Sequence, residues 1–383
     1  MSEPTETPNA LQSTEPPFRA DHVGSLLRPP GLLAARQAHA EGRLAAEDLR
    51  GVEDEAITTV VALQEDIGLR AATDGEFRRS SWHLDFIYQL GGVQNTGEPM
   101  QVRWRTAPGG KAPTSANLTG LAVLAPVRLK HTIFGEDFQY LARQTRTALP
   151  KLTIPSPSMV HYRGGAIDHA VYPDVEEFWR DLSAAYADEV RALGELGCRY
   201  LQFDDTSLAY LNDPAQREML AARGEDAEHQ HLRYIKVINA ALAGRPEGMR
   251  VTTHMCRGNY RSSWAAEGGY DFVAEALFGE LNVDGFFCEF DDERSGGFEP
   301  LRFVPPGKQV VLGLVTSKRP ELESKDLLKR RVEEASKYVP LDQLCLSPQC
   351  GFSSTVEGNA LTLDEQVAKL RLVVETAEEI WPQ

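Results

Sequence analysis

Residues 174–205 read DVEEFWRDLSAAYADEVRALGELGCRYLQFDD, a helix-like segment followed directly by a strand-like one. Asp174 is a good N-cap, apolar residues then recur at helical spacing, and Gly197 follows as a stop signal. Residues 198–203 form a short apolar run that ends in two aspartates. The stretch predicts a helix that leads into a buried strand, which is the repeating unit of an α/β protein.

The same alternation continues to the end of the chain and extends more weakly toward its beginning. Further helices are predicted at 44–67, 229–243, 271–281, 324–338 and 364–381. Further strands are predicted at 21–25, 70–74, 152–154, 249–254, 283–289, 309–315 and 344–346. With 198–203 this gives eight strands that alternate with helices, the number that a (β/α)8 TIM barrel requires. A doubly wound open sheet is the alternative fold.

Two segments depart from this alternation. Residues 90–126 are rich in Gly, Pro and Asn and contain alternating apolar runs, so we expect an inserted hairpin or lid after the second strand. Residues 1–17 are rich in Ser, Thr, Glu and Pro and carry no apolar segment, which predicts a disordered tail rather than a signal peptide. The remainder, 18–383, is expected to form a single catalytic barrel.

The bulk composition excludes several classes of function. The 383 residues carry a formal net charge of −16, which argues against a general partner of nucleic acid or of an anionic membrane. No stretch approaches the length of an apolar membrane span. Five cysteines without an export signal fit a cytoplasmic protein whose thiols are buried, metal-bound or catalytic. An oligomer is left open.

Polar residues of a particular kind follow the predicted strands. Active sites of (β/α)8 barrels form at the carboxyl ends of the strands, and here those ends supply His254, Cys256, Glu289 and Cys350. Imidazole, thiolate and carboxylate are the ligands that Zn²⁺ takes in tetrahedral sites. Because the four lie on three different strands and include a displaceable carboxylate, they predict an open catalytic zinc site that activates a thiol.

Each of these residues also has an ordinary structural interpretation. A lone His-x-Cys pair is a weak metal motif, since Cys is commonly a small buried hydrophobe, as we expect for the three other cysteines. Glu289 could pair with Arg294, and Glu76 could pair with Arg78 or Arg79. Asp204 and its neighbour Asp205 could cap the next helix. It is the gathering of all these residues at one end of one barrel that favours a site.

Several ordered motifs resemble one known family. They are Asp21-His22-Val23-Gly24-Ser25, Thr73-Asp74-Gly75-Glu76-Phe77, Gln202-Phe203-Asp204, His254-Met255-Cys256, Cys288-Glu289 and Ser347-Pro348-Gln349-Cys350-Gly351. They resemble the catalytic barrel of cobalamin-independent methionine synthases, in their short single-barrel branch. The resemblance implies that His254, Cys256, Glu289 and Cys350 bind zinc. It also implies that Val23, Gly24 and Ser25 hold the carboxylate of homocysteine while Glu76 and Asp204 hold its amino group. A methyl group from a 5-methyltetrahydrofolate-type donor would then give methionine.

The sequence departs from the family pattern at three points, one of which is the loop 153–158. The second, N-terminal barrel of the full-length enzymes is absent, and Thr316 stands where the family has a general-acid histidine, which leaves the methyl donor open. One alternative is the short relative that opens epoxides with coenzyme M, whose sulfonate would suit Arg257 and Arg261. A second is a non-catalytic barrel that binds zinc or another ligand.

Overall fold

A parallel sheet forms the centre of the molecule in the computed structural model, which describes residues 15–100, 102–106, 113, 118–164 and 167–382. Its seven strands are hydrogen-bonded in the order β1-β4-β5-β6-β7-β8-β9, and every neighbouring pair is parallel. The strands are β1 Ala71–Ala72, β4 Leu149–Pro155, β5 Tyr200–Asp205, β6 Arg250–Met255, β7 Gly285–Glu289, β8 Gln309–Val315 and β9 Leu344–Pro348. Because the strands are parallel, all their carboxyl ends lie at the same edge.

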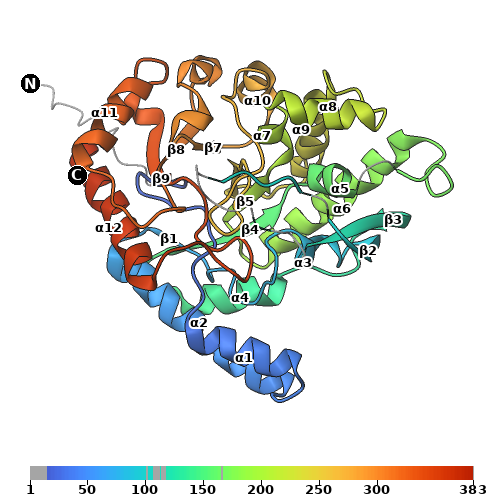
Figure 1. Cartoon of the computed structure of the whole chain (residues 1–383), viewed down its shortest axis with the longest axis horizontal. Coiled ribbons are helices and arrows are strands. Elements are labelled where there is room, and N and C mark those ends of the chain that lie inside the picture. The colour runs from blue at the N-terminus through green and yellow to red at the C-terminus, as the bar shows by residue number, and fades with distance from the viewer. Residues whose placement is uncertain (1–14, 101, 107–112, 114–117, 165–166, 383) are drawn as a thin grey trace, which may run out of the picture.

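Helices surround this curled sheet, as Figure 1 shows. They are α1 Pro30–Ala40, α2 Ala46–Ile67, α3 Leu84–Ile87, α4 Gly135–Gln144, α5 Ser158–Gly164, α6 Val175–Glu195, α7 Ser207–Tyr210, α8 Pro214–Ala222, α9 Gln230–Leu242, α10 Ala274–Glu280, α11 Lys325–Ala335 and α12 Leu363–Ile380. Three short 3₁₀ turns occur at Glu293–Ser295, Glu299–Phe303 and Leu341–Gln343. The six predicted helices and seven of the eight predicted strands are present, with bounds shifted by a few residues, whereas α1, α3, α4, α5, α7 and α8 were not predicted.

Helix α6 and strand β5 illustrate how the sequence produces this unit. The Asp174 carboxylate accepts a hydrogen bond from the Glu176 N–H and so caps the helix. The apolar positions of the helix are buried, among them Phe178, Leu182 and Tyr186, and β5 is buried along its whole length. Each such side chain contributes roughly 1.5–3 kcal/mol when it leaves water, which holds the helix on the sheet.

The prediction of a first strand at 21–25 is wrong. No strand forms within it, and a single parallel bridge lies one residue earlier, between Ala20 and Leu346 of β9. Beyond that point the chain turns at Gly24, whose φ of 149° is incompatible with an L-residue strand. On its other side the segment is held by the Thr73 hydroxyl, which donates to the Gly24 carbonyl, and by the Leu26 N–H, which donates to the Gly75 carbonyl. The segment thus lies between β9 and the residues that follow β1.

The predicted insertion contains an antiparallel pair of strands, β2 Gly91–Pro99 and β3 Thr119–Arg128. Its ladder has two irregularities, and β3 packs against α5 and α6. In Figure 1 the pair lies to one side of the central strands, beside α6. Residues 101, 107–112 and 114–117 of the insertion lie outside the described residues.

The predicted N-terminal tail falls mostly on residues that the structure does not describe. Residues 1–14 of it lie outside the described residues, whereas Pro17 is buried. All five cysteines of the chain are free and buried. Among the described residues, every helix is too short or too polar to cross a bilayer.

Candidate active site

The four predicted metal ligands meet at the carboxyl edge of the sheet. His254 is on β6 and Cys256 directly follows it, Glu289 ends β7, and Cys350 lies just beyond β9. Their ligand atoms all lie within 4.8 Å of one another, and all four residues are buried. The sequence therefore anticipated a cluster that the fold assembles from residues almost a hundred positions apart.

The geometry of the cluster suits a tetrahedral metal ion. The two thiol sulfurs lie 3.6 Å apart, and ligands at zinc bond lengths lie about 3.3–3.8 Å from one another in a tetrahedron. Both ring nitrogens of His254 are buried without a hydrogen-bond partner. The Cys350 thiol lies beside this imidazole and raises its pKa against the effect of burial, so the imidazole and the thiol face each other as two ligands of one metal ion would. One imidazole, two thiols and one carboxylate are a donor set that fits zinc.

The protonation of the two thiols is linked. The hydrogen bond between them lowers the pKa of Cys350 well below its ordinary value, helped by the neighbouring His254 against the effect of burial. The same hydrogen bond, together with burial, raises the pKa of Cys256 well above its ordinary value. Without a metal the pair therefore holds one proton, which a metal ion would displace.

A buried cation lies beside the cluster that sequence reasoning did not identify. Lys318 follows β8, and its Nζ donates to the carbonyls of Gly258 and Ser263 and to the Asn259 side chain. Its charge lowers the pKa of Cys350 and opposes the rise of the pKa of Glu289, which burial and the Cys350 charge cause. A lysine directly after a buried strand, in the run Thr316-Ser317-Lys318, was the available signal.

The cluster opens onto a partly enclosed cavity. Val23, Ser25, Glu76 and Asp204 line it together with His254, Cys256 and Cys350. The structure thus brings most of the predicted substrate-binding residues to the predicted metal ligands. The exceptions are Gly24 and Glu289, which do not line the cavity.

Gly24 and Gly351 keep the approach to Ser25 and Glu76 open. A Cβ on Gly24 would lie 2.7 Å from the Thr153 methyl group and 3.4 Å from a Glu76 oxygen. A Cβ on Gly351 would lie 2.0 Å from the Ser25 hydroxyl oxygen. Side chains at these two positions would displace the groups that face the cavity.

Glu76 reaches the cavity from a turn with a left-handed backbone. Its φ is 61°, and that of the preceding Gly75 is 68°. For a residue with a Cβ this conformation costs about 1–2 kcal/mol, so neighbouring groups must hold it. Asp74 accepts a hydrogen bond from the Glu76 N–H, and the buried Arg28 donates to the Glu76 and Arg79 carbonyls, each at 2.7 Å.

The two cavity carboxylates lack a full complement of cations. Glu76 Oε1 accepts from the Thr153 hydroxyl at 2.8 Å and lies 3.7 Å from Arg79, whereas Oε2 is buried without a partner. Burial raises the pKa of Glu76. Burial also raises the pKa of Asp204 to about 7, an effect that His254 opposes and Glu76 reinforces. An ammonium group placed between these carboxylates would supply the missing positive charge.

Asp205, one residue further along, has a different role. Its side chain accepts from the hydroxyls of Ser156, Ser158 and Ser207 and from the Leu208 N–H. The predicted cap of the next helix is therefore Asp205, while Asp204 faces the cavity. The two neighbours point in opposite directions, as successive strand residues do.

An aromatic and aliphatic wall closes the side of the cavity that faces the insertion, and sequence reasoning did not identify it. Trp104 stacks on Tyr260 with ring centroids 5.2 Å apart, and Trp82 packs on His83 at 4.4 Å. The apolar lining also includes Met100, Val102 and Leu118. Arg163 from α5 adds a cation to this lining.

Arg257, Arg261 and Thr316 do not line the cavity. Arg257, considered as a sulfonate ligand, is unsuited to that role because its guanidinium is fully buried and donates to the Gly268, Glu289 and Ser295 carbonyls and to Tyr270. Arg261 is half exposed and lies 3.8 Å from Glu357. The Thr316 N–H donates to Glu323.

Comparison with known proteins agrees with this geometry. The model of the family "Cobalamin-independent synthase, Catalytic domain" matches residues 20–379. The chain belongs to this family. It is 48% identical to the Bacillus subtilis protein YxjH over 95% of both chains, and 24% identical to a methionine synthase of Pyrococcus abyssi over 92% of this chain and 88% of that relative. The crystal structure of a putative vitamin-B12 independent methionine synthase from Listeria monocytogenes superposes with a TM-score of 0.77 at 38% identity, over 97% of this chain and all of the other.

Proposed function

We propose that this protein is a zinc-dependent methyltransferase that methylates the thiol of homocysteine and so forms methionine. The observation that carries the proposal is one cavity with two complementary ends. At one end lie four donors that fit zinc, three of which line the cavity, and at the other lie two buried carboxylates, of which Glu76 has Arg79 at 3.7 Å and one oxygen without a partner. Homocysteine carries a thiol for the first end and an ammonium for the second. Membership of the family and its methionine synthase relatives support the same function.

The side chains divide the work of binding. Glu76 and Asp204 would hold the ammonium, while the Ser25 hydroxyl and the backbone of Val23 and Gly24 would hold the carboxylate. His254, Cys256, Glu289 and Cys350 would hold zinc, which supplies a Lewis acid that keeps the substrate sulfur as a thiolate at neutral pH. Glu289, the one carboxylate among the four, would be the ligand that yields its place to the substrate sulfur.

The transfer itself forms one bond and breaks one. The thiolate sulfur attacks the methyl carbon, and the methyl group leaves its nitrogen on a donor of the 5-methyltetrahydrofolate type. That nitrogen needs a proton, which Thr316 does not supply, so a proton from solvent has to serve. The aromatic wall with Trp104 and Tyr260 is the surface on which we place the donor.

The finer features of the fold belong to the same proposal. We regard the segment 20–26 as the eighth position of a (β/α)8 barrel, because it is hydrogen-bonded to β9 on one side and to residues 73–75 on the other. The β2–β3 insertion would act as a lid, because residues Met100, Val102, Trp104 and Leu118 of it line the cavity.

The test combines metal content with methyl transfer. The purified protein is analysed for zinc and assayed with homocysteine and a panel of methyl donors. A Cys350→Ser variant is expected to bind zinc more than about 100-fold more weakly and to lose transfer, since loss of a ligand should exceed the effect of an outer-shell change. Cys345→Ser is the control, because Cys345 is equally buried on β9 but packs against Val311 and Phe287.

Three outcomes count against the proposal. Full zinc content and full transfer in Cys350→Ser would overturn the metal assignment. Absence of turnover with every donor would favour the non-catalytic barrel. Turnover of coenzyme M with an epoxide, but not of homocysteine, would favour the epoxide-opening enzyme, although that thiol has no amine for Glu76 and Asp204 to bind.

A further inference from the structure

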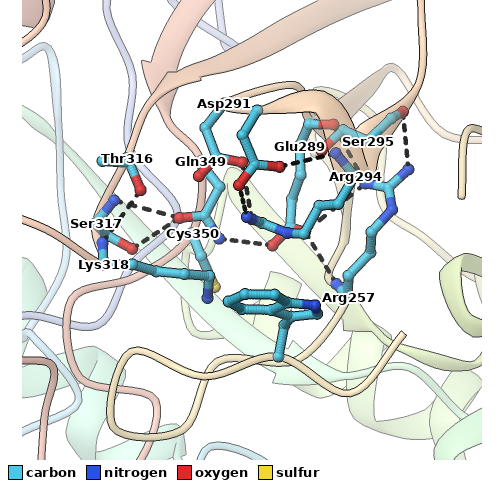
Figure 2. A network of polar contacts seen from close by, with 12 residues as sticks. Arg257, Glu289, Asp291, Arg294, Ser295, Thr316, Ser317, Lys318, Gln349 and Cys350 are labelled. Carbon is cyan, nitrogen blue, oxygen red and sulfur yellow. Dashed lines mark hydrogen bonds and ion pairs between the residues drawn. The ribbon is translucent and has the colours of Figure 1, made fainter. Parts of the chain in front are cut away.

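The carboxylate of Glu289 is held by donors on both of its oxygens. Oε1 accepts from the Gln349 amide nitrogen at 2.8 Å, and Oε2 accepts from the Arg257 backbone N–H at 3.1 Å. Figure 2 shows Gln349 between Ser317 and Glu289. We propose that Gln349 is a positioning residue that fixes the Glu289 carboxylate for the metal. The inference rests on the zinc site of the proposed function.

The orientation of the Gln349 amide is determined by its other neighbour. Its oxygen accepts from both the backbone N–H of Ser317, at 3.2 Å, and the Ser317 hydroxyl, at 3.0 Å. Two donors on the oxygen side leave the NH₂ group facing Glu289. Ser317 is itself held, because Asn359 donates to its carbonyl at 2.7 Å. The amide therefore has one satisfied orientation and presents a donor to the ligand.

The backbone is shaped to bring Gln349 to this place. The β8–β9 ladder is irregular between Gly313 and Val315, and beyond it the Gln349 N–H donates to the Val315 carbonyl at 2.7 Å. A Cβ on Gly313 would lie 2.8 Å from the Gln349 Cα and 2.9 Å from the Cys288 carbonyl oxygen. Irregularities of this kind re-aim side chains beside active sites, and glycine permits the close approach.

The strand end at Thr316-Ser317 has a supporting role in this arrangement. Ser317 is fully buried; its backbone N–H donates to Gln349, and its hydroxyl lies within hydrogen-bond distance of both the Gln349 oxygen and the Gly351 carbonyl, so this loop supports the metal ligand instead of facing the substrate. Outer-shell groups of this kind orient metal ligands, and their loss typically lowers metal affinity 10–100-fold. A glutamine that only filled the core would have no such effect on the metal.

The test measures zinc affinity by competition with a chelator, independently of methyl transfer. Gln349→Met keeps the volume of the side chain and removes its donor, and zinc is expected to bind about 10–100-fold more weakly. Gln366→Met is the matched control. Gln366 is also 1% exposed and accepts from the Leu27 N–H at 2.7 Å, so its loss should lower stability but leave zinc affinity unchanged. Zinc affinity in Gln349→Met within threefold of the unaltered protein would overturn the proposal.

A double-mutant cycle separates positioning of Glu289 from a general effect. In a Glu289→Ala background the Gln349→Met change should have no further effect on zinc affinity, because the ligand it positions is gone. An equal loss in both backgrounds would overturn the proposal. If Gln349→Met fails to fold, Ser317→Ala replaces it, with an expected loss of about threefold to tenfold; an unchanged affinity would be the contrary result. If zinc affinity responds as expected but the protein transfers no methyl group to homocysteine, the proposed function is wrong and the role of Gln349 stands.

Discussion

The two polar ends of the cavity differ in what they lack. The end with His254, Cys256 and Cys350 offers soft donors within 4.8 Å of one another, and a buried lysine lies beside it. The end with Glu76 and Asp204 offers carboxylate oxygens, which are hard donors for a cation. Few hydrogen-bond donors surround them, and one Glu76 oxygen has no partner. The first arrangement suits a metal ion and the second suits an organic cation.

Under the proposed function, this difference lets one edge of the sheet bind a substrate that carries both a thiol and an ammonium group. Both ends are buried and anionic, so each destabilises the folded protein until a bound cation neutralises its charge. Because the missing cations differ in chemistry, substitutions at one end should leave the function of the other intact. Separate readouts for metal and for amino acid can therefore test whether the two ends act independently.

The largest expected effect of this kind concerns the carboxylate end. Asp204→Asn and Glu76→Gln each remove a negative charge, and truncation of one partner of a buried charge pair costs about 2–5 kcal/mol. We therefore expect kcat/KM for homocysteine to fall by roughly 100-fold or more, with zinc content unchanged. Steady-state kinetics and metal analysis on the same samples check this. Loss of zinc in either variant would show that the ends are not independent.

A smaller effect should follow pH. The pKa of Asp204 is about 7, so its carboxyl is mostly neutral at pH 6 and mostly ionised at pH 8. Because an ammonium binds the ionised form, the affinity for methionine should rise about tenfold between pH 6 and pH 8. Methionine is the suitable probe since it has no thiol to titrate, and calorimetry gives the affinity directly. In Asp204→Asn the dependence should disappear; its persistence there would assign it to another group.

Much of this contrast is accessible from the sequence, for a physical reason. An apolar run that ends in a polar residue marks a strand end, and parallel strands bring their ends together. His254, Cys256, Glu289 and Cys350 can therefore be grouped from the amino-acid sequence alone. The strand at 21–25 was overestimated because apolar pattern does not report that Gly24 leaves the ladder.

What the sequence did not reveal depends on contacts between distant residues. Lys318 appears as an ordinary loop lysine until its carbonyl acceptors at Gly258 and Ser263 are seen. The left-handed turn at Glu76 is held by Arg28, which lies 48 residues earlier. The aromatic wall joins Trp104 to Tyr260 across more than 150 residues of sequence. No local period or spacing encodes these pairs.

The apolar wall provides a third, smaller contrast with the two polar ends. Trp104→Ala removes the ring that stacks on Tyr260, and such aromatic contacts contribute about 0.5–1.5 kcal/mol beyond burial. We expect the KM for the methyl donor to rise about threefold to tenfold, with zinc content and methionine affinity unchanged. Trp104→Phe should retain most of the function. A variant that weakens methionine binding instead would place the amino acid, not the donor, against this wall.

The smallest effect on activity is expected at Glu189, a buried carboxylate remote from the cavity. One oxygen accepts from the Ile133 N–H, the other has no partner, and burial raises its pKa to about 8. Since the unfolded carboxyl ionises near its ordinary value, the folded protein binds the extra proton, and stability is lost as pH rises from about 4.5 to 8, by at most roughly 5 kcal/mol. Urea unfolding at pH 5.5 and 8.5 should show this decline, and Glu189→Gln should reduce it without changing methionine affinity at either pH. Loss of the pH dependence of methionine binding in Glu189→Gln would contradict this prediction, because it would assign that dependence to Glu189 instead of Asp204.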